Sequence, residues 1–301
     1  MALKQIKSKI ISTQKTGKVT KAMEAVSAVK MRKTQEQALR SRAYVHTALR
    51  ILRNIARSRE LHDHPLIQEG VGGATLLVIV TSDKGLAGSV NSAVIKLAEQ
   101  YIRASSDGVA IAIGRKAVEF AGRAGIPLLL EYTNLRDDVS IENVTEMARI
   151  AVEGFRDGTY RSVRVIYQNF ISTFEQAPSM RAVLPLDPQE VHNTMRDIRP
   201  RKGKFSDDTV SIDTDVQYTV EPSIEEVLST LIPQLVQIML YHALVESKAC
   251  EHSARMVAMK NATDKTKEIK KALTIVYNKA RQAAITAEVS EITGGIEAMK
   301  S

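Results

Sequence analysis

Apolar residues recur at alternating spacings of three and four positions near both ends of the chain. Near the start these positions are Leu3, Ile6, Ile10, Thr13 and Gly17. Near the end the same rhythm is followed by Ile269, Leu273, Val276, Ala280 and Ala283. A helix patterned in this way carries one narrow apolar seam, which is typical of coiled coils, whereas a helix on the surface of a domain carries a broader stripe.

The helices that carry these seams are predicted to be long. Residues 234–293 contain neither proline nor glycine, and residues 4–61 contain no proline and only one glycine, Gly17. A helix over the first of these stretches would be about 90 Å long, which a soluble chain cannot bury in a core of its own. Ser223 and Glu226 predict a capping box where the last helix begins. Pro233 is expected to kink that helix, and the pair of glycines at 294 and 295 is expected to end it.

The middle of the chain alternates between strand and helix patterns. Short β-branched or leucine-rich segments predict strands at residues 74–81, 109–113, 127–132 and 162–169, with further edge strands at 180–184 and 216–220. Helical segments lie between them at residues 93–104, 116–124 and 140–156, and residues 192–215 are charged and predict an exposed excursion. Such alternation predicts a mostly parallel sheet with right-handed crossovers. The expected fold class is α/β: a long antiparallel two-helix coiled coil built from both termini, plus a central, mostly parallel, Rossmann-like α/β domain.

The expected segments are an N-terminal coiled-coil helix at residues 1–61, a globular body at 72–220 and a C-terminal coiled-coil helix with a projecting tip at 221–301. If both helices leave the body at the same end, Met1 lies opposite roughly residue 280, and about 20 residues of the last helix project beyond it. The apolar positions of this overhang are Ala283, Ala284, Ile285, Val289 and Ile292. A lone helix with an apolar face is marginal in water, so another protein is expected to surround it.

The positive charge of the chain is concentrated in its first fifth. Residues 1–60 contain fifteen Lys and Arg and three acids, a net +12, so the rest of the chain carries −4 of the total of +8. A rod of one sign favours an acidic partner over a solvated basic face. Nucleic acid is the rival partner, although few aromatic residues lie among the basic ones and no zinc-finger or helix-turn-helix pattern occurs.

Two features of the sequence are candidate sites for small molecules or metals. Residues 81–91 (TSDKGLAGSVN) follow a predicted strand, where parallel sheets often bind phosphate, but Gly85 and Gly88 fit neither common phosphate-binding glycine pattern, which favours a structural turn. The candidate metal ligands do not form a recognisable set of four: His62, Asp63 and His64, and separately His242, Glu246, Cys250 and His252. We therefore expect no catalytic residue, no bound cofactor and no metal. The single cysteine excludes an internal disulfide, and the apolar runs are too short to predict a membrane span or a signal peptide.

Several terminal motifs resemble those of a known family. They are residues 6–10 (IKSKI), 18–24 (KVTKAME), 27–33 (SAVKMRK), 251–260 (EHSARMVAMK) and 277–292 (YNKARQAAITAEVSEI). Together they closely resemble the gamma subunit of the rotary proton-transporting ATP synthase, from end to end of the chain. The resemblance extends to residues 81–91, although Ser89 stands where a second glycine is usual, and Ala287 and Ile296 replace the commoner glutamine and alanine.

The resemblance implies a central axle inside a ring of alpha and beta subunits, with the body on the membrane-embedded c-ring and beside the epsilon subunit. It implies one copy per complex, with the ATP chemistry on the beta subunits. The missing targeting segment predicts a peripheral location on the cytoplasmic face of a bacterial plasma membrane, with a processed organelle protein as the alternative. By matching motifs, the residues implied to contact the ring are Lys21, Met23, Lys30, Arg32, Lys33, Arg255, Arg281, Gln282, Thr286, Glu288 and Glu291. Two rival interpretations remain: a coiled-coil protein that binds nucleic acid, and an enzyme that binds a nucleotide near residues 85–89.

Overall fold

The computed structural model describes residues 3–54, 59–104, 107–187 and 221–300. The helices in this part of the chain are α1 (Leu3–Asn54), α2 (Arg59–His62), α3 (Val90–Ala104), α4 (Arg115–Ala124), α5 (Glu142–Arg156) and α7 (Ile224–Lys300). The strands are β1 (Ala74–Val80), β2 (Gly108–Ile113), β3 (Leu128–Tyr132), β4 (Tyr160–Phe170) and β5 (Gln176–Leu184). The predicted edge strand at 216–220 and the charged excursion at 192–215 lie outside the described residues. Contacts divide the chain into two compact units, residues 27–255 and residues 1–26 with 256–301.

The unit formed by residues 27–255 is built on a five-stranded sheet in the order β3-β2-β1-β4-β5. The first four strands are parallel, and β5 pairs antiparallel with β4 at the edge. Strand β1 lies at the centre and is buried on both faces, which explains its continuous apolar sequence. The predicted parallel sheet is therefore confirmed, with an antiparallel edge that the sequence had marked only as an extra strand.

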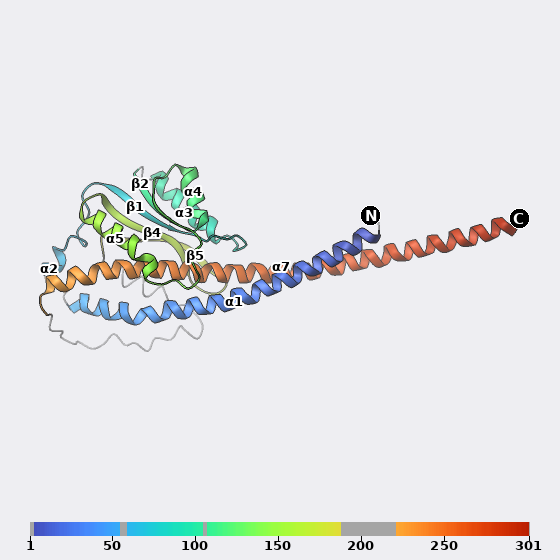
Figure 1. Ribbon diagram of the computed structural model, residues 1–301, viewed down its shortest axis with the longest axis horizontal. Helices are drawn as coiled ribbons and strands as arrows, with labels where there is room; N and C mark the ends of the chain where they lie inside the picture. The colour runs from blue at the N-terminus through green and yellow to red at the C-terminus, as the bar shows by residue number, and fades with distance from the viewer. Residues whose placement is uncertain (1–2, 55–58, 105–106, 188–220, 301) are drawn as a thin grey trace. The chain divides into compact units, whose positions relative to one another are not determined.

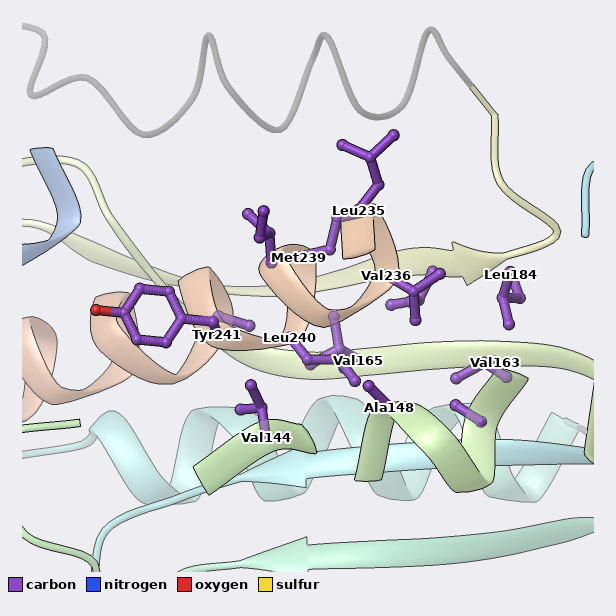
Figure 2. Close-up of a cluster of buried hydrophobic side chains, with 14 of the residues drawn as sticks. Val144, Ala148, Val163, Val165, Leu184, Leu235, Val236, Met239, Leu240 and Tyr241 are labelled. Atoms are coloured by element: carbon purple, nitrogen blue, oxygen red, sulfur yellow. The ribbon is translucent and has the colours of Figure 1, made fainter. Parts of the chain in front are cut away.

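Helices cover both faces of this sheet (Figure 1). On one face, α3 packs over β1, β4 and β5 and α4 packs over β2 and β3, with Val94, Ala98, Ala117 and Phe120 in the core that they share. On the other face, α5, part of α1 and the first half of α7 share one larger core with the strands. Figure 2 shows Val236 and Leu240 of α7 on the side of the helix toward Val163 and Val165 of β4.

The first half of α7 is thus a core helix and not one arm of a simple rod. Every residue from Ile238 to Ser253 is buried, and an apolar window in the helix that meets the length and composition of a membrane span is 61% buried inside the protein. The narrow seam is predicted only for residues 269–283 of this helix, whereas the first half is apolar on nearly all sides, and such a helix packs inside a domain.

The two ends of α7 give one confirmation and one correction. The hydroxyl of Ser223 accepts a hydrogen bond from the backbone N–H of Glu226 at 3.2 Å, so the predicted N-terminal cap is present. The predicted end at Gly294 and Gly295 is wrong, because α7 continues to Lys300. Each glycine costs a helix only about 1 kcal/mol, and the residues that follow, Ile296 to Lys300, favour helix. The helix also runs through Pro233 without a break.

Candidate functional site

A doubly wound sheet usually binds its ligand outside the carboxyl ends of the strands, where the strand order reverses. Here the reversal falls beside β1, because the chain adds β2 and β3 on one side of β1 and then β4 and β5 on the other. The loop that follows β1, residues 81–91, therefore occupies the position where a ligand would be sought.

The polar groups of this loop are bonded within the protein. The Thr81 hydroxyl donates to the Ile113 carbonyl at 3.1 Å and accepts from the Ala117 backbone N–H at 2.8 Å. The Ser82 backbone N–H donates to Asn91 Oδ1 at 2.9 Å. A carboxylate, Asp83, accepts from the backbone N–H of Arg115 at the start of α4. These bonds make the loop a structural turn and place a negative charge where a phosphate would bind.

Side chains of α7 fill the crevice itself. Lys248 Nζ donates to the Leu135 carbonyl at 3.2 Å, and Arg255 Nη2 donates to Glu251 Oε1 at 2.7 Å. Arg255 also reaches the carbonyl oxygens of Lys84 and Gly85 at 3.4 and 3.3 Å. The remaining cavity, lined in part by Ser247 and Glu251, measures about 10 Å³, which is room for one water and not for a nucleotide. The geometry favours the structural turn over the nucleotide site.

The residues considered as metal ligands have other partners. Nε2 of His252 lies 2.9 Å from Asp137 Oδ1, and Cys250 Sγ donates to the Gln168 carbonyl at 3.3 Å. Nδ1 of His64 accepts from the Leu66 backbone N–H. Burial raises the pKa of the Cys250 thiol well above its usual range, so the thiol is neutral and unreactive. Within residues 3–54, 59–104, 107–187 and 221–300, no group of three or more His, Cys, Asp or Glu is placed to hold a metal.

In the second unit the two chain ends pair as an antiparallel coil. The hydroxyls of Thr20 and Thr263 lie 2.7 Å apart and are buried. Gly17 lies against Thr266, so both pairs of residue numbers add to 283. Continuing this register places Leu3, where α1 begins, level with residue 280, within two residues of the predicted offset. The helix beyond that residue extends past the end of α1 in register.

The seam predicted for α1 is confirmed, and the one predicted for α7 is only partly right. Ile6 is buried and Ile10 is half-buried on α1, while on α7 Leu273 and Ala280 are half-buried. Ile269 and Val276, however, are exposed, and Thr266 and Tyr277 take the inner positions. Apolar residues lie on more than one side of α7 here, so the spacing fits two different seams. The predicted seam contains Ile269 and Val276, and the observed one contains Thr266 and Tyr277 instead. Several large apolar side chains of this helix are therefore exposed, among them Ile269, Ile275, Val276, Ile285, Val289 and Ile292.

Replacing Gly17 with leucine is expected to destabilise the coil by about 2 kcal/mol, because an added Cβ would already lie 2.7 Å from the Thr266 hydroxyl oxygen. Thermal unfolding followed by helical circular dichroism would measure the loss. Lys15→Leu, at an exposed position of the same helix, is the matched control. Equal unfolding temperatures for the two variants would contradict the close approach at Gly17.

Comparison with known proteins gives consistent matches over the whole chain. The family profile described as ATP synthase matches residues 2–299. The ATP synthase gamma chain of Legionella pneumophila (strain Corby) is 36% identical over 301 residues, covering 98% of this chain and 99% of that protein. The gamma chain of Roseiflexus sp. (strain RS-1) is 37% identical over 307 residues, covering 98% of each.

The chain belongs to the ATP synthase gamma chain family.

Solved structures agree with the fold of a gamma chain. A chain from the mitochondrial ATP synthase of Euglena gracilis in rotational state 3 gives a TM-score of 0.62 at 18% identity, covering 99% of this chain and 94% of that one. A chain from the central stalk and c-ring of the Tetrahymena thermophila mitochondrial ATP synthase gives 0.57 at 24% identity, covering 81% and 99%. The resemblance noted in the terminal motifs is thereby confirmed, and the chain is a subunit of an ATP-synthesising complex.

The residues that the motifs imply to contact the ring fall in both units, and those in the coiled unit (residues 1–26 and 256–301) are mostly exposed to solvent. Their exposed members are Lys21, Arg281, Gln282, Thr286, Glu288 and Glu291, and Met23 is half-buried. The Thr286 hydroxyl donates back to the Gln282 carbonyl at 3.0 Å, as threonine often does within a helix. Their contact role stays a prediction, and their exposure is compatible with it.

The gamma-chain motif residues in the unit of residues 27–255 differ among themselves. Arg32 is exposed, but Lys30 pairs with Asp137 at 2.6 Å and Lys33 pairs with Asp138 at 3.4 Å. Arg255 is 8% exposed and bonded within the chain. For these three residues the observed partners are intramolecular, so a contact with a beta subunit would have to compete with them.

Sequence reasoning missed the carboxylates that bind these basic residues. Asp137 and Asp138 lie in the connection between β3 and α5, and Glu251 lies one turn before Arg255 on α7. The spacing of four between Glu251 and Arg255 was a readable signal for an ion pair on one helix. Nothing local marks Asp137 as the partner of Lys30, which lies 107 residues earlier.

Proposed function

We propose that the chain is the central rotor shaft of an ATP synthase, which couples proton-driven rotation of the membrane ring to ATP synthesis or hydrolysis on the surrounding catalytic subunits. Its partners would be the alpha and beta subunits of the ring, the epsilon subunit and the c-ring. The observation that carries the proposal is the division of α7. Its first half is buried against the sheet, and its second half is exposed, pairs with α1 and extends past it in register with apolar side chains in water.

Exposed apolar positions along the coil support a surrounding sleeve of protein. Ile285, Val289 and Ile292 are 52, 56 and 64% exposed, and α1 adds Val19 at 58%. A helix that leaves such side chains in water gains stability when another protein covers them. Lysines on the same coil would meet acidic surfaces of that sleeve.

The coupling mechanism follows from symmetry. A two-helix rod has no threefold axis, so it cannot present the same surface to three identical beta subunits. It therefore stabilises a different conformation at each of the three sites, and its rotation moves each site through all of them. The shaft needs no active site for this role, and the filled crevice of its own sheet supports a chain that carries none.

The same proposal covers location and organisation. The chain would be a peripheral protein on the cytoplasmic face of a bacterial plasma membrane, present once in each complex. The division into residues 1–61, 72–220 and 221–301 stays a prediction about which segments act as shaft and which as body.

Arg281→Ala is expected to weaken coupling without preventing assembly, because the exposed guanidinium would bond to the ring only in the complex. Proton pumping per ATP hydrolysed, measured in membrane vesicles, should fall by about twofold or more. Arg103→Ala, which removes an exposed arginine from α3, is the control. Pumping per ATP equal to that of the unaltered complex would count against a contact at Arg281.

The first test of the function as a whole is purification of the tagged chain from its own membranes. An ATPase that contains alpha and beta subunits in equal numbers would support the shaft. If the chain is recovered with nucleic acid, or alone, the result would favour the rival interpretation of a coiled-coil protein that binds nucleic acid through its basic helix. Nucleotide bound by the isolated chain near residues 85–89 would favour the enzyme rival, which the filled crevice argues against.

A further inference from the structure

The connection between β3 and α5 carries a polar segment, residues 135–139, which we name the strap. Its contacts with α1 use three successive strap residues. Lys30 Nζ donates to Asp137 Oδ2 at 2.6 Å, Lys33 Nζ to Asp138 Oδ2 at 3.4 Å, and the Gln37 side-chain amide to the Val139 carbonyl. Spacings of three and four place these three side chains on one face of α1. The strap therefore follows α1 for about two turns of the helix.

The same segment also binds α7. Lys248 Nζ donates to the Leu135 carbonyl at 3.2 Å, and Nε2 of His252, one turn later, lies 2.9 Å from Asp137 Oδ1. The two oxygens of the Asp137 carboxylate are thus divided between the helices, Oδ2 to α1 and Oδ1 to α7. One side chain joins both helices to the sheet.

Charge and burial around Asp137 favour an ionised carboxylate. Partial burial raises the pKa of Asp137, but the hydrogen bond from Lys30, the charges of Lys30 and Lys248, and the charge that His252 carries at acid pH outweigh it and leave that pKa below its usual value. Burial lowers the pKa of His252, and the raising effects of Asp137 and Glu251 do not offset it. A neutral imidazole therefore donates Nε2–H to an ionised carboxylate at neutral pH.

The apolar contacts of α1 do not fix how the helix is rotated about its own axis, whereas the hydrogen bonds of the strap do. Ala38, Ala48 and Leu52 of α1 join the core of the sheet, and such contacts are non-directional. Charge-assisted hydrogen bonds fix distance and angle, so they determine how α1 is turned about its own axis. The side chains of Lys30 and Asp137 are 46 and 38% exposed, so this ion pair contributes little to the free energy of unfolding. Its role is to position α1 relative to the strap.

We propose that the strap holds α1 and α7 at a fixed setting on the body while torque passes between body and shaft, with Asp137 as its central positioning residue. The proposal rests on the shaft function. The strap would stay closed through the whole rotation, so that both helices turn as one with the sheet.

The first experiment compares two variants in the complete ATP synthase, reconstituted in vesicles. Asp137→Ala removes the shared carboxylate, whereas Glu119→Ala removes an equally exposed ion pair on α4, Lys116–Glu119 at 2.7 Å. Asp137→Ala removes both bonds of this carboxylate, to Lys30 and to His252, which should shift the strap at least about fivefold toward a form detached from the helices. We expect assembly and ATPase activity to be retained in both variants, and proton pumping per ATP to fall about twofold or more in Asp137→Ala alone. Equal pumping by the two variants would overturn the proposal.

A rescue experiment separates positioning from stability. Gln37→Cys and Asp138→Cys, added to Asp137→Ala, can be joined by a short bis-maleimide, because the Gln37 side chain lies against the residue next to Asp138. The one native cysteine of this chain, Cys250, is fully buried and does not compete. The cross-link should restore pumping per ATP in the Asp137→Ala complex, and in the parent complex it should leave pumping unchanged. A cross-link that fails to rescue, or that stops the parent complex, would mean that the strap opens during turnover or acts otherwise, and would overturn the proposal. Failure of the shaft function itself is distinguished from these outcomes, since the unaltered chain would then not purify with alpha and beta subunits.

Discussion

Gly114→Ala is expected to destabilise the protein by about 4 kcal/mol, a large share of the 5–15 kcal/mol by which a domain of this kind is stable. Gly114 follows β2 at a φ of +87°, a region that residues with a side chain rarely adopt. An added Cβ would overlap the backbone carbonyl of Thr81, where β1 ends. Neither strand end can move aside, because Gly114 N–H also donates to the Tyr132 carbonyl at 2.7 Å.

Gly122→Ala provides the matched control for that substitution. Gly122 lies on the exposed side of α4, and an added Cβ would meet nothing within 4 Å. Alanine is favoured over glycine in a helix by about 1 kcal/mol, so this variant is expected to gain stability. Urea unfolding followed by circular dichroism should move the two midpoints in opposite directions. A midpoint for Gly114→Ala close to that of the unaltered chain would contradict the packed junction of β1, β2 and β3.

Arg255→Leu is expected to destabilise the protein by about 3 kcal/mol, because it leaves the Glu251 carboxylate buried without its strongest partner. Both side chains are less than a tenth exposed, and Lys248 lies 3.8 Å from the same carboxylate and compensates only in part. The substitution also removes the donor to the carbonyls of Lys84 and Gly85, so the loop after β1 loses its attachment to α7.

A double variant isolates the charge effect in the same urea experiment. Glu251→Leu combined with Arg255→Leu removes both charges, so its loss of stability should be smaller than that of Arg255→Leu alone. A double variant that is less stable than the single one would show that the arginine acts through the loop carbonyls and not through Glu251. Either result bears on the motif prediction for Arg255, since a variant that fails through folding cannot report on a contact with a beta subunit.

The parallel sheet was predictable because each of its strands is a short apolar run between turn residues. The predicted strands at 74–81, 109–113, 127–132 and 162–169 correspond to β1, β2, β3 and β4 within about two residues at each end. The place of α7 was predictable but missed. Its first half is apolar on nearly all sides, a pattern typical of a buried helix, but the length of the helix favoured a coiled coil instead.

The polar contacts of the site were not predictable in the same way. The pairing of Lys30 with Asp137 depends on how a loop after β3 crosses α1, and no local pattern encodes a contact over 107 residues. The inner and outer faces of the coiled part of α7 were also ambiguous, because Val276 and Tyr277 are neighbours and both fit a seam. The seam is fixed by the register with α1, through Thr20 and Thr263, which a single helix sequence does not contain.

In the antiparallel coil the numbers of two facing residues always add to 283, so the coil can be lengthened or shortened only by equal changes in both helices. Suppose that seven residues are removed from one helix alone, between Gly17 and residue 26 of α1 or between residue 256 and Thr266 of α7. Every position on the far side of the removed segment would then be displaced by seven from its partner, so that Gly17 would no longer meet Thr266. Removing seven from both helices, at positions that face each other, would keep the heptad phase on each and restore the close approach on the far side of the cut. Length changes that preserve the coil are therefore paired: each addition or loss near one end of the chain calls for an equal one near the other, more than two hundred residues away.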